Sequence, residues 1–184
     1  MFEQHFSLRA TGTARLPVLA IYAIYLVMID QVSRYKNKTL LELQRHSAAD
    51  RRTGSLGDIE VAREDGTIFE ALEIKHKRLI TEAMIIDCAH KVEGAGYPVN
   101  RYYILTTHHS CQPTPEMQKR LREIAGKTGC QIVVNGVQPT IRYYLRLLSK
   151  PSLILPAYLD LLTEERAISP EHVTAWREIL TSEF

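Results

Sequence analysis

Three charged residues in the middle of the chain have the side-chain types and the spacing needed to hold a divalent cation beside a lysine. Asp58 opens a run of alternating apolar and polar residues, and Glu73 and Lys75 lie near the end of the next such run. Asp65-Gly66 separates the two runs, and this dipeptide favours a tight hairpin turn because both residues tolerate positive φ. A loop of two or four residues there would place Asp58 opposite Glu73, whereas a bulge or an odd-numbered loop would break that register.

The facing of Asp58 and Glu73 has an electrostatic consequence. Facing residues on adjacent strands have Cβ atoms about 4.5–5.5 Å apart, and like charges there are destabilising. A cation between the carboxylates would remove the repulsion, and hard oxygen ligands without a nearby His or Cys pair favour Mg²⁺ over zinc. We therefore expect Asp58, Glu73 and Lys75 to be catalytic, with Asp58 and Glu73 as metal ligands. The simpler alternative is a hairpin whose exposed face only carries charges.

The sequence Gly57-Asp58 followed by Glu73-Ile74-Lys75 resembles the PD-(D/E)XK nuclease superfamily, in which an acidic residue opens one strand and Glu-x-Lys lies on the next. The flanking residues 46–58 and 73–77 are most similar to type II restriction endonucleases, although glycine stands where the family usually has proline. The resemblance implies a Mg²⁺-dependent endonuclease that hydrolyses phosphodiester bonds in double-stranded DNA. It also implies one or two metal ions and the main-chain carbonyl of Ile74 as a further ligand.

Two alternatives to a restriction enzyme stay open. One is a repair or junction-resolving nuclease of the same superfamily, and the other is a catalytically inert DNA-binding module that keeps the fold. In several nucleases of the superfamily a helical glutamate before the first strand reaches the metal, so Glu42 is an accessory candidate; a solvated helix face is the alternative. Basic side chains on loops beside the motif could contact DNA phosphates or bases. These candidates are Arg51, Arg52, Lys77, His108 and His109.

Hydrophobic periodicity and turn residues predict the elements that must position these side chains. Helices are predicted from Thr13, as N-cap, to about Tyr35, from Lys38 to about His46, over 81–92 and over 115–127. Strands are predicted over 58–62, 68–75, 102–106 and 131–134, and Ile59, Val61, Ile68, Leu72 and Ile74 should share the apolar face of the hairpin. Further helices are predicted over 140–148, 153–162 and from about Ser169.

The order of these elements predicts an α/β fold, a mixed β-sheet flanked by helices with an additional C-terminal helical segment. The resemblance implies that the sheet is restriction-endonuclease-like. We expect residues 1–184 to form a single nuclease domain, with a core of about 13–136 and C-terminal helices of about 139–184. A catalytic domain of a longer protein is the alternative.

Composition sets further expectations about partners and compartment. The chain has 184 residues and a net charge of +2, so charge that binds DNA must be local. Cys88, Cys111 and Cys130 are odd in number and widely spaced, which argues against a disulfide framework and fits a cytoplasmic protein. The apolar run 16–29 is shorter than the roughly 20 residues that span a bilayer, so no membrane association is expected. Cutting both strands of a palindromic site predicts a homodimer.

Overall fold

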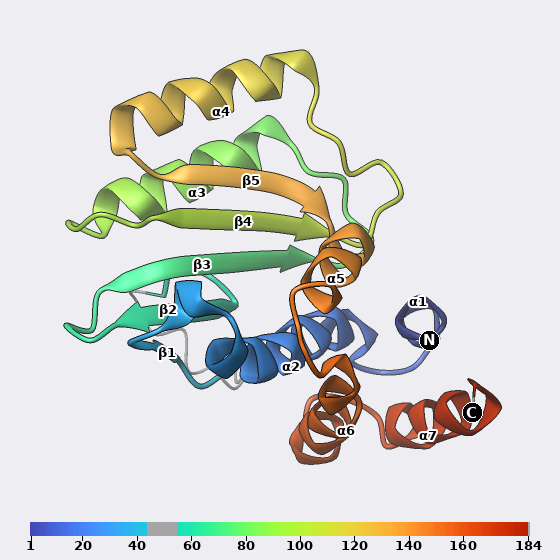
Figure 1. Ribbon diagram of the computed structural model, residues 1–184. Helices are drawn as coiled ribbons and strands as arrows, with labels where there is room; N and C mark the ends of the chain where they lie inside the picture. Colours follow the sequence, from blue (N-terminus) through green and yellow to red (C-terminus); the bar gives the residue numbers. More distant parts are fainter. Residues whose placement is uncertain (44–54, 184) are drawn as a thin grey trace.

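A five-stranded mixed β-sheet forms the centre of the computed structural model, which describes residues 1–43 and 55–183 (Figure 1). Its strands are β1 (Lys38–Leu40), β2 (Ile59–Arg63), β3 (Ile68–Lys75), β4 (Arg101–Thr106) and β5 (Gln131–Gly136). They lie in chain order, with β1, β2 and β3 paired antiparallel and β3, β4 and β5 paired parallel. The predicted α/β class with a mixed sheet is therefore confirmed.

Helices cover both faces of the sheet (Figure 1). On one face lie α3 (Glu82–Gly94) and α4 (Pro115–Thr128), which connect the parallel strands. Towards the other face lie α2 (Leu16–Gln31), α5 (Val137–Leu145), α6 (Ile154–Glu164), α7 (Glu171–Glu183) and the short α1 (Phe2–Phe6). Each face of the sheet therefore has its own hydrophobic core, one packed against α2 and one against α3.

α2 is apolar nearly all round because it is the central helix of the larger core, as the sequence predicted. It is shorter than predicted, because the 3₁₀ helices Thr13–Arg15 and Ser33–Tyr35 flank it. The hydroxyl of Thr13 donates to the carbonyl of Ala10 (2.7 Å) instead of capping the helix, so the predicted N-cap is wrong. Among the described residues, 13–31 is long and apolar enough to cross a membrane, but 72% of its most apolar window is buried inside the protein. Packing in the core therefore accounts for its composition.

The β2–β3 hairpin reaches the predicted register at its far end by an unexpected route. The amide of Arg63 donates to the carbonyl of Thr67 (2.8 Å), so the loop has three residues, with Gly66 at φ 82°. A bulge at Phe69 then adds one residue to β3, so that Val61 pairs with Glu70. The odd loop and the bulge each shift the register by one residue, and the two shifts cancel.

The bulge also reverses the face of one predicted core residue. Ile68 packs on the α3 side of the sheet, whereas Ile59, Val61, Leu72 and Ile74 pack on the α2 side as predicted. The assignment of Ile68 to the same face was therefore wrong. Side chains alternate between faces only while the strand is regular, and the extra residue interrupts that alternation.

The predicted helix from Lys38 to about His46 is wrong over the part that the structure describes. Lys38–Leu40 is the edge strand β1, paired with the outer edge of β2, and residues 41–43 belong to no helix. A segment this short has little helical stability of its own. Hydrogen bonds to the open edge of β2, including the bond from the Leu41 amide to the Glu60 carbonyl (2.9 Å), decide its conformation.

Glu70 is a fully buried carboxylate on the α2 face of the sheet. Its oxygens accept hydrogen bonds from the hydroxyls of Tyr25 (2.5 Å) and Tyr35 (2.8 Å) and pair with the guanidinium of Arg34. The side chain of Arg34 is 28% exposed, so the pair lies at the border of the core. Glu70 therefore ties α2 and the segment that follows it to β3.

A second buried polar cluster joins the two ends of the chain. His5 of α1 contacts the hydroxyl of Tyr158 through Nδ1 and donates from Nε2 to the carbonyl of His172, both at 3.0 Å. Burial lowers the pKa of His5 to about 4, although the bond to the carbonyl opposes this shift. Trp176 is fully buried beside His5, so the predicted apolar stripe of the last helix is a core stripe.

Candidate active site

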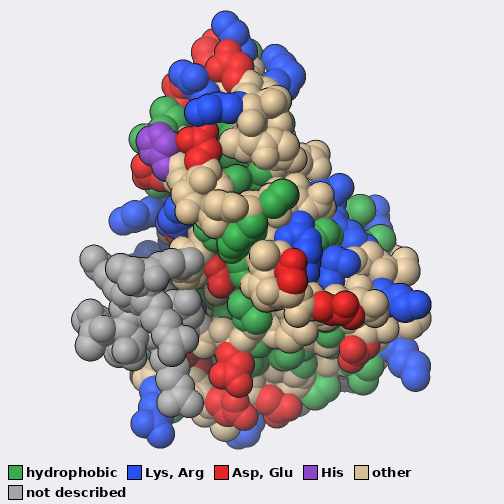
Figure 2. Space-filling model, turned by 90° about the vertical axis from the view of Figure 1, so that its left-hand side faces the viewer, with side chains coloured by type: hydrophobic (Ala, Val, Ile, Leu, Met, Phe, Trp, Pro, Cys, Tyr) green, Lys and Arg blue, Asp and Glu red, His purple; other side chains and the backbone are tan. Residues whose placement is uncertain are grey.

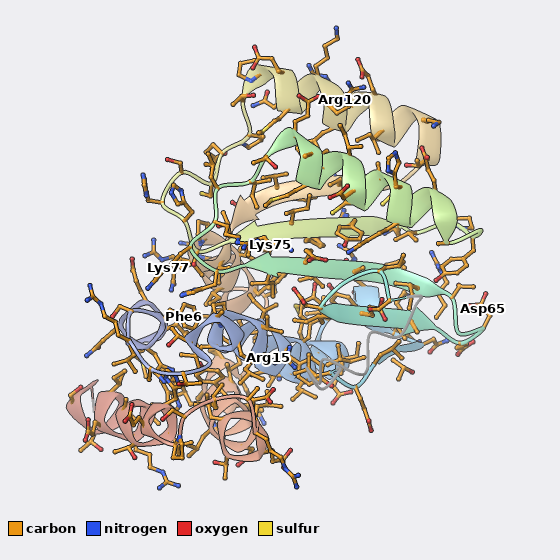
Figure 3. All side chains as sticks on the ribbon, turned by 180° about the vertical axis from the view of Figure 1, so that it is seen from behind. Phe6, Arg15, Asp65, Lys75, Lys77 and Arg120 are labelled. Carbon is orange, nitrogen blue, oxygen red and sulfur yellow. The ribbon has the colours of Figure 1, made fainter. Side chains whose placement is uncertain are left out.

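The three predicted catalytic residues meet at one end of the sheet. Asp58 immediately precedes β2, and Glu73 and Lys75 lie at the C-terminal end of the neighbouring β3. Figure 3 shows Lys75 at this end of β3 and Asp65 at the opposite end, on the hairpin turn. Because β4 runs parallel to β3, the residues that follow β4 emerge at the same end as Lys75.

Asp58 is fixed to β3 by two hydrogen bonds. Its amide donates to the carbonyl of Leu72, and its Oδ2 accepts from the amide of Ile74, both at 2.7 Å. The carboxylate therefore lies on the backbone of the Glu-x-Lys motif, where it lines a groove with Lys75. The regular facing of Asp58 and Glu73 that we predicted is replaced by this clamp.

Glu73 points to the α3 side and is held by three side chains. Lys75 Nζ lies 2.5 Å from its Oε1, and Lys91 Nζ (3.0 Å) and the Tyr102 hydroxyl (3.2 Å) bind its Oε2. Burial alone would raise the pKa of Glu73, but the hydrogen bonds and charges of Lys75 and Lys91 outweigh burial and lower it. Glu73 is therefore ionised at neutral pH, and two lysines balance its charge.

Lys91 and Tyr102 are site residues that sequence reasoning missed. Lys91 comes from α3 and donates to the carbonyl of Leu56 (3.3 Å) as well as to Glu73; the Tyr102 hydroxyl joins the same two residues. Both side chains thus tie Glu73 to the segment that leads into Asp58. The available signal in the sequence was a lysine beside the buried residues of a helix that directly follows the motif.

Gly57, which precedes Asp58, lies against the backbone of β3. A Cβ atom at this position would lie 2.5 Å from the carbonyl oxygen of Leu72, which is a backbone atom and cannot rotate away. This is the same oxygen that accepts the amide of Asp58. Only glycine therefore lets the start of β2 approach β3 closely enough to form the Asp58 clamp.

The oxygen donors at this end of the sheet are few. Among the described residues, no group of three or more His, Cys, Asp or Glu is placed to hold a metal ion. Mg²⁺ commonly uses only one or two carboxylates and completes its shell with water and substrate phosphate. Asp58, Glu73 and the carbonyl of Ile74 supply hard oxygens of this kind, on one short stretch of adjacent strands.

A groove of about 440 Å³ opens beside Asp58 and Lys75. Its walls come from the segment ahead of α2, from the end of β3 and from Ala167. The lining residues are Gly12, Ala14, Arg15, Val18, Asp58, Ile74, Lys75, His76, Arg78 and Ala167. Arg15 is buried and pairs with Glu165 (2.9 Å), so its position is fixed by the C-terminal helices. The candidate active site is therefore accessible from solvent.

Thr107 brings two of the predicted DNA-contacting segments together. Its amide donates to the carbonyl of Lys75 (3.1 Å), and its hydroxyl oxygen accepts the amide of Lys77 (2.7 Å). The loop with His108 and His109, whose rings stack 4.2 Å apart, therefore starts beside the turn that carries Lys77. Lys77 itself has φ 54°, a left-handed conformation that costs a non-glycine residue about 1–2 kcal/mol.

The remaining candidates are not brought to the site. Glu42 is exposed, lies outside any helix, and raises the pKa of Tyr22 after the larger effect of burial. It is therefore near α2, and its predicted placement on a helix is wrong. Arg51 and Arg52 lie outside the described residues. The site consists of Asp58, Glu73 and Lys75, with Lys91 and Tyr102 behind them.

No family model matches the chain, and a search of curated protein sequences gives no match. The resemblance to the PD-(D/E)XK superfamily thus rests on the motif alone.

Proposed function

We propose that this protein is a Mg²⁺-dependent DNA endonuclease with a restriction-endonuclease-like fold. One observation carries the proposal: Asp58 is clamped to the backbone of Glu73-Ile74-Lys75 at the open end of the sheet. Carboxylates at this end of the sheet could hold a metal ion, and a bound metal ion can activate water and polarise a phosphate. The α/β architecture with a mixed sheet is compatible with this function.

Each residue of the site would have a separate role in catalysis. Asp58, Glu73 and the carbonyl of Ile74 would hold one or two Mg²⁺ ions, and bound Mg²⁺ would lower the pKa of a water molecule and polarise the scissile phosphate. Lys75 orients or deprotonates the attacking water, or stabilises negative charge in the transition state. Lys91 and Tyr102 hold Glu73 in place.

The decisive experiment is to incubate the protein with mixed-sequence double-stranded DNA and Mg²⁺ and to sequence the cut ends. Asp58→Ala and Glu73→Ala should abolish cleavage by removing a metal ligand, and Lys75→Ala should abolish it while metal binding is kept. Lys119→Ala, which removes an exposed charge from α4, is the matched control and should cleave like the wild type. Cleavage that survives all three site substitutions would refute the assignment.

A second candidate function follows from the ion pairs of Glu73. Lys75 and Lys91 already balance this carboxylate without a cation, as expected for an inert DNA-binding module that keeps the fold. Binding of DNA without cleavage in Mg²⁺ or Mn²⁺ would favour that function. Preferential cutting of nicked or branched DNA would instead favour a repair or junction-resolving nuclease.

We further propose that the protein is a homodimer that acts on double-stranded DNA in the cytoplasm. Trp176 is buried within one chain and is not available for an interface. Tyr143, Leu147 and Leu153 are the exposed apolar side chains of α5 and the segment that follows it, and they offer a contact surface. A monomer both free and on DNA, measured by sedimentation, would refute the dimer.

A further inference from the structure

A second groove, of about 670 Å³, continues from the candidate active site along the N-terminal segment. Residues 8–13 form one wall and the turn after β3 forms the other, with Ser169 and Glu171 beside them. His76 lines both this groove and the one that contains Asp58 and Lys75, so the two grooves are neighbours that meet at His76. A chain that lies in the second groove therefore leads directly to the candidate active site.

The charge of this groove suits a polyanion. Arg9 and Lys77 line it, and Arg78, which follows Lys77 in the chain, lines the neighbouring groove. All three are exposed and make no ion pair with any described carboxylate. Glu171 is the acidic residue among the described lining, so positive charge exceeds negative charge.

The opposite end of the sheet has a different charge pattern. Figure 2 shows that face, around the hairpin turn, and its basic side chains are interspersed with acidic ones. At the active-site end, by contrast, residues 75–78 place Lys75, His76, Lys77 and Arg78 in succession, and Figure 3 shows Lys75 and Lys77 at the same end of β3. An excess of positive charge along residues 75–78 favours binding of the phosphate backbone.

The backbone of Lys77 gives an independent reason to assign a role to its side chain. Its φ of 54° is unfavourable for lysine and would suit glycine or asparagine. Thr107 holds the turn in this conformation through the bond to the Lys77 amide. A lysine that is unfavourable for folding, exposed and unpaired at the edge of a basic groove indicates that its charge is used in binding.

We propose that the groove between residues 8–13 and the turn after β3 takes the phosphodiester backbone of one DNA strand, with Arg9 and Lys77 as phosphate contacts. This inference rests on the proposed nuclease function, because it assigns the strand that reaches Lys75. The N-terminal segment is thus part of the DNA-binding surface, and the contacts are independent of base sequence.

The test is to measure binding of a short labelled DNA duplex, in Ca²⁺ to prevent cleavage, at several salt concentrations. Each phosphate contact contributes about 0.9 to the slope of log K against log salt. Lys77→Gly and Arg9→Ala should each lower that slope by about 0.9, whereas Lys77→Arg and the control Lys119→Ala should keep it. Lys77→Gly should also raise the Tm by about 2–4 °C, because glycine relieves the left-handed strain.

The outcomes separate this inference from the proposed function. Wild-type protein that binds no duplex overturns the proposed function. If the wild type binds and cuts DNA but the Lys77→Gly and Arg9→Ala variants keep the wild-type salt slope, the groove does not bind the DNA strand, and the proposed nuclease function still stands. A Lys77→Gly variant with a lower Tm overturns the argument from backbone strain. A higher Tm with a lower slope supports the groove, since loss of binding then has no origin in misfolding.

Discussion

Replacement of Gly57 with alanine should destabilise the protein by about 2–4 kcal/mol and impair the active site. The added methyl group would lie 2.5 Å from the Leu72 oxygen and 2.9 Å from its carbonyl carbon, so the two strands must separate. Overpacking of this kind costs about 1–3 kcal/mol. Loss of the hydrogen bond from the Asp58 amide to the same oxygen adds about 1 kcal/mol.

The assays are urea and thermal denaturation, both monitored through the fluorescence of Trp176, which is the single tryptophan of the chain and is fully buried. For a domain of this size, 1 kcal/mol corresponds to about 2–4 °C in Tm, so the Tm should fall by roughly 4–16 °C. DNA cleavage should fall even at temperatures where the variant is folded, because the Asp58 carboxylate moves with its backbone.

Gly126→Ala is the matched control for this substitution. Gly126 lies in α4 with no atom near the position of an added Cβ, so alanine there should stabilise the protein by about 0.5–1 kcal/mol. A Gly57→Ala variant as stable and as active as the wild type would refute the requirement for a close approach of β2 and β3 at Gly57.

Three further predictions concern charged groups. Lys91→Met should lower kcat about 10-fold, because Glu73 loses one of its links to the segment before Asp58. It should also lower the Mg²⁺ concentration needed for half-maximal activity, because the positive charge beside Glu73, a proposed metal ligand, is removed. Glu70→Gln should cost about 2–3 kcal/mol in urea denaturation and leave cleavage intact, since a partly exposed Arg34 loses its partner on the far face of the sheet. In His5→Gln, the free energy of unfolding should depend less on pH in acid than it does in the wild type. The pKa of His5 is about 4 in the folded protein and 6.5 when unfolded, so wild-type protein should lose up to about 3 kcal/mol of stability as the pH falls from 6.5 to 4.

Each of these predictions has a contrary outcome. A Lys91→Met variant that needs more Mg²⁺ at unchanged kcat would mean that Lys91 does not position Glu73. Loss of cleavage by folded Glu70→Gln protein would place Glu70 in the site. Equal dependence of stability on pH in wild type and His5→Gln, measured between pH 6.5 and 4, would show that the buried histidine is not the titrating group.

The sequence by itself determined the elements that depend on local backbone preference. Alternating residues around Asp65-Gly66 predicted the hairpin, Thr81 and Gly129 marked helix ends, and the spacing of Asp58 and Glu73 predicted that they would reach the same end of the sheet. The register of Ile59 and Val61 was predicted correctly although the loop was not, because a three-residue loop and a one-residue bulge compensate. The predicted facing of Asp58 and Glu73 was wrong, because the Asp58 amide binds the carbonyl of Leu72.

Tertiary structure alone decided which distant groups complete the site. Lys91 and Tyr102 bind Glu73 because α3 and β4 fold back onto β3, and β1 forms because β2 offers an open edge. The basic groove joins residues 8–13 to residues 169–171, which only the packing of the terminal helices brings together. The spacing of residues fixes the directions of side chains within one element, but contacts between elements depend on how their buried surfaces pack, which no local pattern records.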